Sequence, residues 1–416
     1  MRIALAAEGT RGDVHPMLGL GSLLTERGHE VVVCAPPDFR AEAELLGFDF
    51  RAVGLPVRAR LAVEAAAVTG GHPRILAAGA RWFREGLPRQ FAELVPATAG
   101  ADLLVAAGVQ AAAASAAEIH GVPYRYVAYC PVLLPSEDHP PFLVPWQNLS
   151  PRWNRLLWRG ARVFHELSIG RLVNRERAVR GLSPVGDVLR HLLGEHPVLA
   201  ADAELAPAPP TSFALTQVSC LHQPRLHCPE GRHASGAALP PKLEAFLEAG
   251  PPPVYVGFGS MSDPDPAGTT RRVLAAVAGL GCRALLSAGW AGLGDLPLPE
   301  GVLRLEDVDH AALLPRLAAV VHHGGAGTTT LAARAGVPQL IVPHLLDQHY
   351  WAERVRSLGL GPPPLPRRGL RATRLEAVLD AVVGNELLAE RAREVGARLR
   401  ARADLGAAAS AILAGP

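Results

Sequence analysis

Apolar runs alternate with helical patterns from the start of the chain. Arg2–Ala7 is a short apolar run, and Pro16–Arg27 carries leucines at helical spacing until Gly28-His29 ends the pattern. A second run, rich in valine, follows at Glu30–Ala35. This strand–helix–strand order predicts a parallel βαβ unit in which residues 8–13 form a glycine-bearing loop.

The same alternation returns in the first half of the chain and again in the second half. It predicts strands at Leu103–Ala107, Pro123–Ala128, Pro253–Phe258, Arg283–Ser287, Ala318–His322 and Gln339–Val342, with helices at Gln110–His120, Thr269–Leu280 and Thr328–Ala335. We therefore expect the α/β class, with two Rossmann-like parallel-sheet domains facing each other across a cleft. The domains are expected at 1–205 and 241–385, separated by a proline-rich linker at 206–240. A C-terminal helix at 386–416 is expected to pack back on the first domain.

Composition narrows the class of protein. Of the 416 residues, 49% are hydrophobic and 19% charged, which allows a large core and excludes general disorder. The net charge of +2 is too balanced for a nucleic-acid partner. Five scattered cysteines argue against a disulfide framework, and the apolar runs are too short for a signal peptide or a membrane span. We expect a cytoplasmic protein, monomeric or dimeric.

Residues 150–180 form one long amphipathic pattern. Trp153, Leu157, Phe164 and Leu167 fall on one stripe, and several arginines line another. We interpret the pattern as an ordinary amphipathic helix with a solvated face; the alternative is a helix that lies on a membrane surface or on a partner.

The strongest chemical signal is the run from His322 to Thr330, His-His-Gly-Gly-Ala-Gly-Thr-Thr-Thr. It follows a predicted strand and opens a predicted helix. Glycines let backbone amides approach an anion, and a helix N-terminus adds partial positive charge. A diphosphate is the expected ligand, although the run is neither a Walker loop nor GxGxxG. The alternative is a plain helix start with threonine caps.

This run, with Asp347-Gln348 further on, resembles the donor-binding signature of family 1 glycosyltransferases of the GT-B fold. The opening Gly9–Pro16 and the segment Val254–Met261 resemble corresponding motifs of sterol glucosyltransferases and bacterial antibiotic glycosyltransferases. The resemblance implies an inverting transferase that moves a hexose from a UDP- or TDP-linked sugar to a hydrophobic alcohol: a sterol or other terpenoid, a macrolide or a polyketide.

The resemblance also implies roles for single residues. The departing diphosphate would be held by Ser260, His323, Gly325, Gly327 and Thr328. Asp347 and Gln348 would bind sugar hydroxyls, and the backbone near Val308 would meet the nucleobase. No cofactor and no metal are expected, since the glycine turn would stabilise the leaving group. Leu331 stands where many plant members carry a ribose-binding glutamate, so uridine and thymidine both remain open.

Asp13 is the candidate general base, because it follows the first strand at the edge where open α/β sheets bind ligands. Two alternatives remain: Asp13 only caps the helix, or His15 is the base.

Two weaker patterns suggest metal sites. Asp263–Asp265 and Asp307–Asp309 each spell Asp-x-Asp, and Cys220, His222, His227 and Cys228 are zinc-ligand types without a known spacing. We interpret both as chance. The alternative functions are a nucleotide-sugar epimerase or hydrolase of the same fold and a non-catalytic nucleotide-sugar-binding auxiliary protein.

Overall fold

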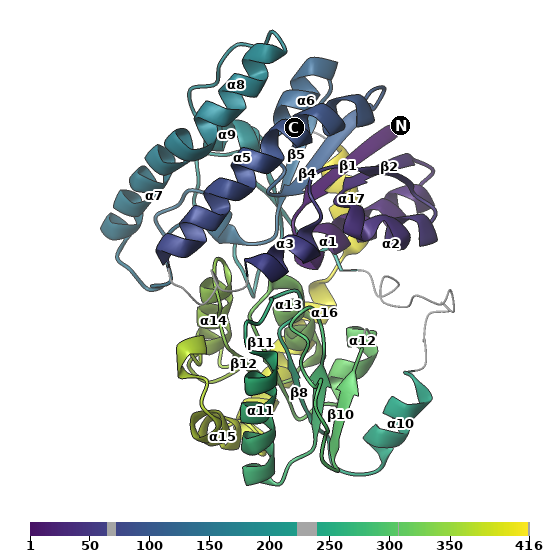
Figure 1. The fold of residues 1–416 in the computed structure, drawn as a ribbon, viewed down its shortest axis with the longest axis vertical. Helices are drawn as coiled ribbons and strands as arrows, with labels where there is room; N and C mark the ends of the chain where they lie inside the picture. Colours follow the sequence, from purple (N-terminus) through teal and green to yellow (C-terminus); the bar gives the residue numbers. More distant parts are fainter. Residues whose placement is uncertain (65–71, 223–238, 307, 415–416) are drawn as a thin grey trace. The chain divides into compact units, whose positions relative to one another are not determined.

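The computed structural model describes residues 1–64, 72–222, 239–306 and 308–414 (Figure 1). The chain divides into two compact units. Unit 1 consists of Met1–Arg60, Gly70–Leu226 and Asp404–Pro416, and unit 2 consists of Leu61–Thr69 and His227–Ala403. No helix in the described residues is long and apolar enough to cross a membrane.

Unit 1 is built on a seven-stranded parallel sheet with the order β3-β2-β1-β4-β5-β6-β7. Its strands are β1 (Arg2–Glu8), β2 (Glu30–Ala35), β3 (Asp49–Ala52), β4 (Leu103–Gly108), β5 (Tyr124–Ala128), β6 (Val198–Ala200) and β7 (Thr216–Val218). The helices along this part of the chain are α1 (Arg11–Glu26), α2 (Arg40–Leu45), α3 (Val57–Val63), α5 (His72–Ala97), α6 (Ala113–His120), α7 (Pro151–His165), α8 (Arg171–Val179), α9 (Val188–Leu193) and α17 (Leu405–Ala414).

Side chains of β1 alternate between two helical layers. Ala4 and Ala6 pack in one core with Leu87 and Phe91 of α5. Leu5 points to the other face, where Gly21 of α1 lies so close that a Cβ there would stand 3.2 Å from the leucine side chain. Burial on both faces explains why the strand is a continuous apolar run.

Unit 2 repeats this architecture with a five-stranded parallel sheet, order β10-β9-β8-β11-β12. Its strands are β8 (Val254–Gly257), β9 (Ala284–Ser287), β10 (Val302–Leu305), β11 (Ala319–His322) and β12 (Gln339–Ile341). Its helices are α10 (Pro241–Glu248), α11 (Pro266–Leu280), α12 (His310–Leu313), α13 (Ala326–Ala335), α14 (Gln348–Ser357), α15 (Ala372–Asp380) and α16 (Glu386–Arg402). The α/β class with two parallel-sheet domains is therefore confirmed.

The units divide the chain differently from the sequence prediction. Strand β7 lies inside the segment 206–240 that was predicted as a linker, yet it pairs with β6. Helix α16 packs on α13 within unit 2, and only α17 joins unit 1, where Arg27 donates to the Gly406 carbonyl at 2.7 Å. Both differences arise because a three-residue strand and a break between two helices leave no periodic signal.

Two predicted helices also have different boundaries. Helix α1 begins at Arg11 instead of Pro16, because Thr10 and Asp13 form a capping box that starts the helix earlier. The long pattern at 150–180 is α7, then a π-helical turn at Glu166–Gly170, then α8.

Candidate functional site

In unit 2 the glycine-rich turn lies at the switch point of the sheet. Strand β8 pairs with β9 on one side and with β11 on the other, so the connections leave β8 and β11 in opposite directions. Ligands of open α/β sheets bind at the carboxyl ends of two such strands. The turn after β11 and the loop after β8 meet at this edge.

His322 fixes the start of the turn from inside the protein. Its side chain is fully buried, with Nε2 2.9 Å from Gln339 Oε1. Its Nδ1 accepts the Gly324 amide at 3.1 Å, so the ring must be neutral with its hydrogen on Nε2. Burial agrees with this assignment, because it lowers the pKa of His322 to about 4. His322 therefore fixes the conformation of the turn. Both of its ring nitrogens have partners inside the protein, so the neighbouring His323 is the histidine that can contact a ligand.

His323 is held between two glycines and has a buried nitrogen without a partner. A Cβ on Gly259 would stand 3.0 Å from its Cε1, and a Cβ on Gly325 would stand 2.6 Å from its Nε2. Its Nδ1 is buried and makes no hydrogen bond in the described structure. Burial, with the nearby His322 and His344, holds its pKa well below the usual range. A neutral imidazole with an unsatisfied buried nitrogen is suited to bind a ligand.

Helix α13 begins directly after this histidine. Its N-cap is Gly325, which offers no side-chain cap. The first amides of a helix lack intrahelical partners, so those of Ala326, Gly327 and Thr328 are available to an anion. The predicted contact Ser260 is buried at the loop after β8. The structure thus brings Ser260, His323, Gly325, Gly327 and Thr328 to one edge of unit 2.

Asp347 and Gln348 follow β12 at the same edge, where a Cβ on Gly324 would stand 3.1 Å from the Gln348 carbonyl oxygen. Asp347 accepts the Trp351 indole N–H at 3.0 Å, and burial raises its pKa to about 6. The Gln348 side-chain oxygen accepts the amides of His344 (2.7 Å) and Leu345 (3.1 Å). In this structure Gln348 therefore holds its own loop, and its Nε2 lies 3.3 Å from the Met261 sulfur.

Two further residues lie at this edge, His344 and Arg367, which were not among the predicted site residues. The His344 ring lies 6.4 Å from that of His323 between centroids, and its Nε2 accepts Arg367 Nη1 at 2.7 Å. Arg367 also pairs with the Asp263 carboxylate at 2.7 Å, so it ties the loop after β8 to the loop after β12. Burial and Arg367 lower the pKa of His344 to about 3. The Val-Pro-His step after a predicted strand was the available signal.

The other predicted residues of unit 2 pack in a hydrophobic core or cap helices. The Val308 side chain lies in a hydrophobic core, which leaves only its backbone for a ligand. Asp265 caps α11, and Asp309 caps α12. Among the described residues, no group of three potential metal ligands is present. Asp307, His227 and Cys228 lie outside the described residues.

In unit 1 Asp13 lies at the corresponding switch point, between β1 and β4. Its carboxylate accepts the Thr10 amide at 2.8 Å, and its main-chain carbonyl accepts the Tyr129 hydroxyl at 3.1 Å. Two glycines make room for it. A Cβ on Gly9 would stand 2.1 Å from Asp13 Oδ2, and one on Gly108 would stand 3.1 Å from Oδ1. Asp13 is therefore both a capping residue and a carboxylate at a ligand-binding edge.

His15 lies two residues after Asp13 in α1. Its Nε2 lies 2.9 Å from Glu42 Oε2, and its ring stands edge-on to Phe39 at 6.1 Å between centroids. Nε2 of His15 therefore faces α2, which contains Glu42.

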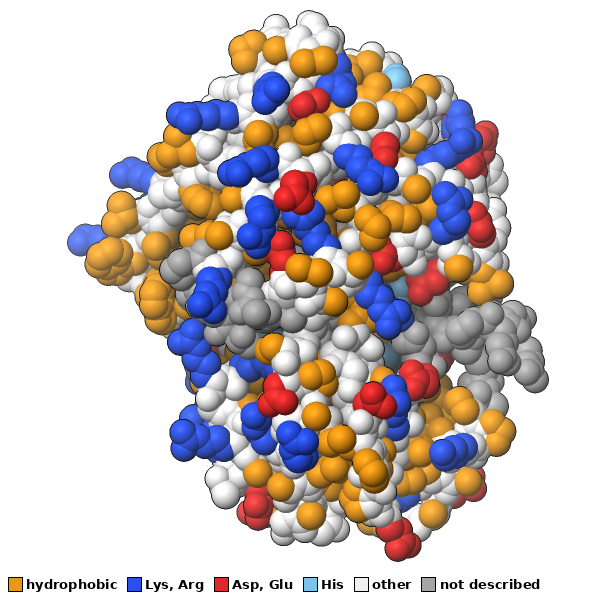
Figure 2. Space-filling model, in the orientation of Figure 1, with side chains coloured by type: hydrophobic (Ala, Val, Ile, Leu, Met, Phe, Trp, Pro, Cys, Tyr) orange, Lys and Arg blue, Asp and Glu red, His pale blue; other side chains and the backbone are white. Residues whose placement is uncertain are grey.

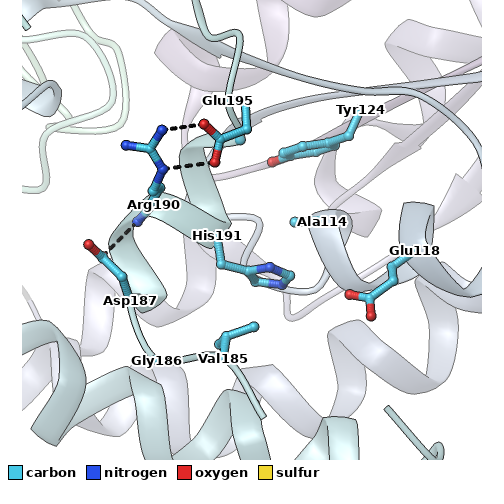
Figure 3. Close-up of a pocket in the computed structure, with 10 residues that line it drawn as sticks. Ala114, Glu118, Tyr124, Val185, Gly186, Asp187, Arg190, His191 and Glu195 are labelled. Carbon is cyan, nitrogen blue, oxygen red and sulfur yellow. Dashed lines mark hydrogen bonds and ion pairs between the residues drawn. The ribbon is translucent and has the colours of Figure 1, made fainter. Parts of the chain in front are cut away.

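Unit 1 also contains a pocket of about 410 Å³ (Figure 3). It is lined by Ala114, Glu118, Tyr124, Val185, Gly186, Asp187, Arg190, His191, Gly194 and Glu195. Tyr124 begins β5, and Glu195 precedes β6, so the pocket opens near the amino ends of these strands. Arg190 pairs there with Glu195.

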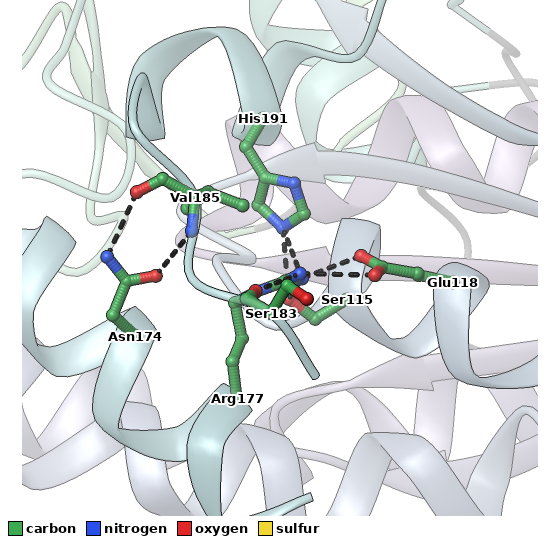
Figure 4. A network of polar contacts seen from close by, with 7 residues as sticks. All are labelled: Ser115, Glu118, Asn174, Arg177, Ser183, Val185 and His191. Carbon is green, nitrogen blue, oxygen red and sulfur yellow. Dashed lines mark hydrogen bonds and ion pairs between the residues drawn. The ribbon is translucent and has the colours of Figure 1, made fainter. Parts of the chain in front are cut away.

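Behind this pocket, the buried Arg177 links α8 to α6 (Figure 4). It donates to Glu118 at 2.7 and 3.1 Å, to Ser115 at 3.0 Å and to the Ser183 carbonyl at 2.6 Å. Burial and Arg177 lower the pKa of His191 to about 4, which makes it a neutral acceptor for the Ser115 hydroxyl at 2.9 Å. The charges are paired within the protein, which favours a structural role.

Comparisons with known proteins give matches in both units. Residues 3–134 match the glycosyltransferase family 28 N-terminal domain, and residues 273–404 match the erythromycin biosynthesis protein CIII-like C-terminal domain. The chain is 37% identical over 373 residues to the vancomycin aglycone glucosyltransferase of Amycolatopsis orientalis, covering 87% of this chain and 85% of the relative. It is 35% identical over 404 residues to dTDP-epi-vancosaminyltransferase of the same organism, covering 94% and 91%.

A solved structure supports the fold. The glycotransferase of kitacinnamycin superposes with a TM-score of 0.73 at 20% identity, covering 99% of this chain and 98% of that chain. The predicted resemblance to antibiotic glycosyltransferases is confirmed by these matches.

Proposed function

Since this chain belongs to the GT-B glycosyltransferases that include those antibiotic-glycosylating relatives, we propose that it transfers a hexose, with inversion, from a nucleoside-diphosphate sugar to a hydroxyl of a hydrophobic natural product. The unpartnered nitrogen of His323 beside the uncapped N-terminus of α13 is the observation that carries the proposal.

Unit 2 would bind the donor through its diphosphate. The His323 N–H and the amides of Gly327 and Thr328 are donors at a helix N-terminus, where negative charge is stabilised. Asp347 would accept hydrogen bonds from sugar hydroxyls, with Gln348 Nε2 as a further donor. Both uridine and thymidine diphosphate fit these contacts. The likeness to a dTDP-sugar enzyme makes the thymidine donor the first to test.

The Asp13 carboxylate would act as the base. The acceptor O–H gives its proton to Asp13 while its oxygen bonds to the anomeric carbon. The bond from that carbon to the diphosphate oxygen breaks at the same time, and the leaving group keeps the electron pair. A single displacement of this kind inverts the configuration. His15, whose Nε2 lies 2.9 Å from Glu42 Oε2, is the alternative base, because a carboxylate partner orients an imidazole for proton transfer.

Activity on a labelled donor tests the reaction. The protein is incubated with radiolabelled TDP-glucose or UDP-glucose and a panel of hydrophobic alcohols comprising sterols, macrolide aglycones and aromatic polyketides. A β-linked product from an α-linked donor is expected. Free sugar or an epimer without transfer would point to a hydrolase or epimerase, and binding without turnover would point to an auxiliary protein.

Two matched variants test the base. Asp13→Asn keeps an oxygen that can accept the Thr10 amide, so the helix start is preserved. We expect kcat to fall by roughly 10²–10⁴-fold with little change in donor KM. His15→Gln is the control, and its kcat should stay within about tenfold of the native value. Full turnover by folded Asp13→Asn would refute the assignment.

A further inference from the structure

Helix α7 presents apolar side chains to solvent on one stripe. Trp153 is 59% exposed, Leu156 54% and Val163 59%, and the stripe continues to Leu167 at 58% in the π-helical turn. At about 100° per residue, positions 153, 156 and 163 of α7 fall within one narrow sector of the helix, together with Gly160. Trp146, 67% exposed, lies just before the helix. We call this set the α7 stripe.

The opposite face of α7 is already used within unit 1. Asn154 donates to the Glu137 carbonyl at 2.8 Å, and the Trp158 indole donates to the His139 carbonyl at 3.0 Å. Asn154, Trp158 and His165 are the buried residues of the helix. The α7 stripe is therefore a second, outward-facing apolar surface in addition to the one that holds the helix in the fold.

Arginines border the stripe, and α7 contains no acidic residue. Arg152, Arg155, Arg159 and Arg162 lie side by side on the neighbouring sector. Arg155 pairs with Glu137 at 2.6 Å and Arg162 with Asp187 at 3.4 Å. Within the described residues, no ion pair is found for the exposed Arg152 or Arg159. Figure 2 shows hydrophobic and basic side chains together on the part of unit 1 where α7 lies.

We propose that the α7 stripe docks on an anionic lipid bilayer surface. The helix combines the features of an interfacial helix: an exposed apolar sector, tryptophans at its start and guanidinium groups next to it that can bind lipid phosphates. Arg152 and Arg159, for which the described part of the chain shows no ion pair, give the surface positive charge, which complements anionic headgroups. With Glu137 and Asp187 counted, four arginines of α7 face two carboxylates, so the surface keeps a positive charge.

Docking would hold the acceptor side of unit 1 at the lipid. The segment that α7 anchors through Glu137 and His139 follows β5 at the ligand-binding edge of the sheet. A hydrophobic acceptor that partitions into the bilayer would then be delivered close to this edge. The docking itself is independent of the proposed reaction, since it is measured without donor or acceptor.

Vesicle co-sedimentation tests the proposal with the full chain. We expect binding to phosphatidylglycerol-containing vesicles, weak binding to pure phosphatidylcholine, and loss of binding at high salt. Arg152→Gln with Arg159→Gln should weaken binding about thirtyfold, from about 1 kcal/mol per arginine. Leu156→Gln with Val163→Gln should weaken it at least about tenfold. Circular dichroism and thermal unfolding confirm that each variant is folded.

Matched controls are Arg371→Gln with Arg374→Gln, and Leu387→Gln, which change exposed side chains in unit 2. These should bind vesicles as the native chain does. Absence of native binding to anionic vesicles at low salt, or equal binding by the α7 variants, would overturn the proposal. So would a native dimer that the α7 variants dissociate, which would assign the stripe to self-association. Loss of turnover on a water-soluble acceptor in the α7 variants would assign it to the acceptor site.

Discussion

Glu8 is a carboxyl group enclosed at the end of β1, and replacing it should change how stability depends on pH. Its side chain is fully buried, with Trp82 Nε1 3.1 Å from Oε1 and Gln90 Nε2 2.6 Å from Oε2. A Cβ on Gly54 would stand 2.6 Å from it. Burial, reinforced by the Glu93 charge, raises the pKa of Glu8 from 4.5 to about 8 against the effect of these hydrogen bonds.

The sign of the effect follows from linkage. In the unfolded chain Glu8 loses its proton near pH 4.5, and in the folded chain near pH 8, so the folded state binds more protons between these values. The free energy of unfolding must therefore fall as the pH rises through this window, and change no further above it. At 1.36 kcal/mol per pKa unit, the shift corresponds to about 5 kcal/mol over the whole window.

Glu8→Gln removes the titration and keeps the shape. Its amide can keep one of the two hydrogen bonds, so a constant loss of about 1 kcal/mol is expected, together with the disappearance of the pH-dependent part. Urea unfolding at pH 5, 6, 7 and 8 measures both. The native protein should lose stability relative to Glu8→Gln at up to about 1.4 kcal/mol per pH unit.

Glu386→Gln, at an exposed position at the start of α16, is the control and should parallel the native profile. Parallel profiles for the native protein and Glu8→Gln would show that Glu8 titrates alike in both states, and the reasoning from burial would be wrong.

Three further predictions concern the edge of unit 2 that we propose binds the donor. His322→Ala leaves the Gly324 amide without its acceptor, so we expect the free energy of unfolding, measured by calorimetry, to fall by about 1–3 kcal/mol and the donor KM to rise. An unchanged donor KM would show that the turn holds its shape without His322. Gly325→Ala would press a Cβ against His323 and should lower TDP affinity at least about tenfold by titration calorimetry, whereas Gly79→Ala, which meets nothing within 4 Å, should not. EDTA should leave the transfer rate within about twofold, because we propose that α13 and His323, and not a metal ion, stabilise the leaving-group charge. Restoration of a lost rate by Mg²⁺ would refute this.

Sequence patterns predicted the central strands of both sheets well. Strands β1, β4, β8 and β11 lie inside their sheets and between helical layers, so each is a continuous apolar run. Strand β12 was also predicted although it is an edge strand, because Gln339–Ile341 is fully buried. The edge strands β3 and β7 were not predicted, because Asp49–Ala52 and Thr216–Val218 are short and partly exposed. Helix starts were shifted where polar caps such as Thr10, and not apolar periodicity, set the first turn.

The candidate site was predictable as a set of loops but not as a set of contacts. The glycine turn and Asp13 could be located because they follow predicted strands at known positions of a parallel sheet. Two contacts could not be predicted: the Gln348 side chain accepts hydrogen bonds from its own loop, and Arg367 donates to His344. Both depend on how the loops pack together. The burial of Glu8 could not be predicted from the sequence either, because its partners Trp82 and Gln90 lie more than 70 residues away along the chain.

A crystal structure with thymidine or uridine diphosphate bound would show whether the glycine-rich turn after β11 binds the diphosphate. We expect phosphate oxygens within about 3 Å of a His323 nitrogen and of the Gly327 or Thr328 amide. A nucleotide bound elsewhere in unit 2, with the Nδ1 of His323 still unpartnered and the first turn of α13 free of phosphate, would contradict it.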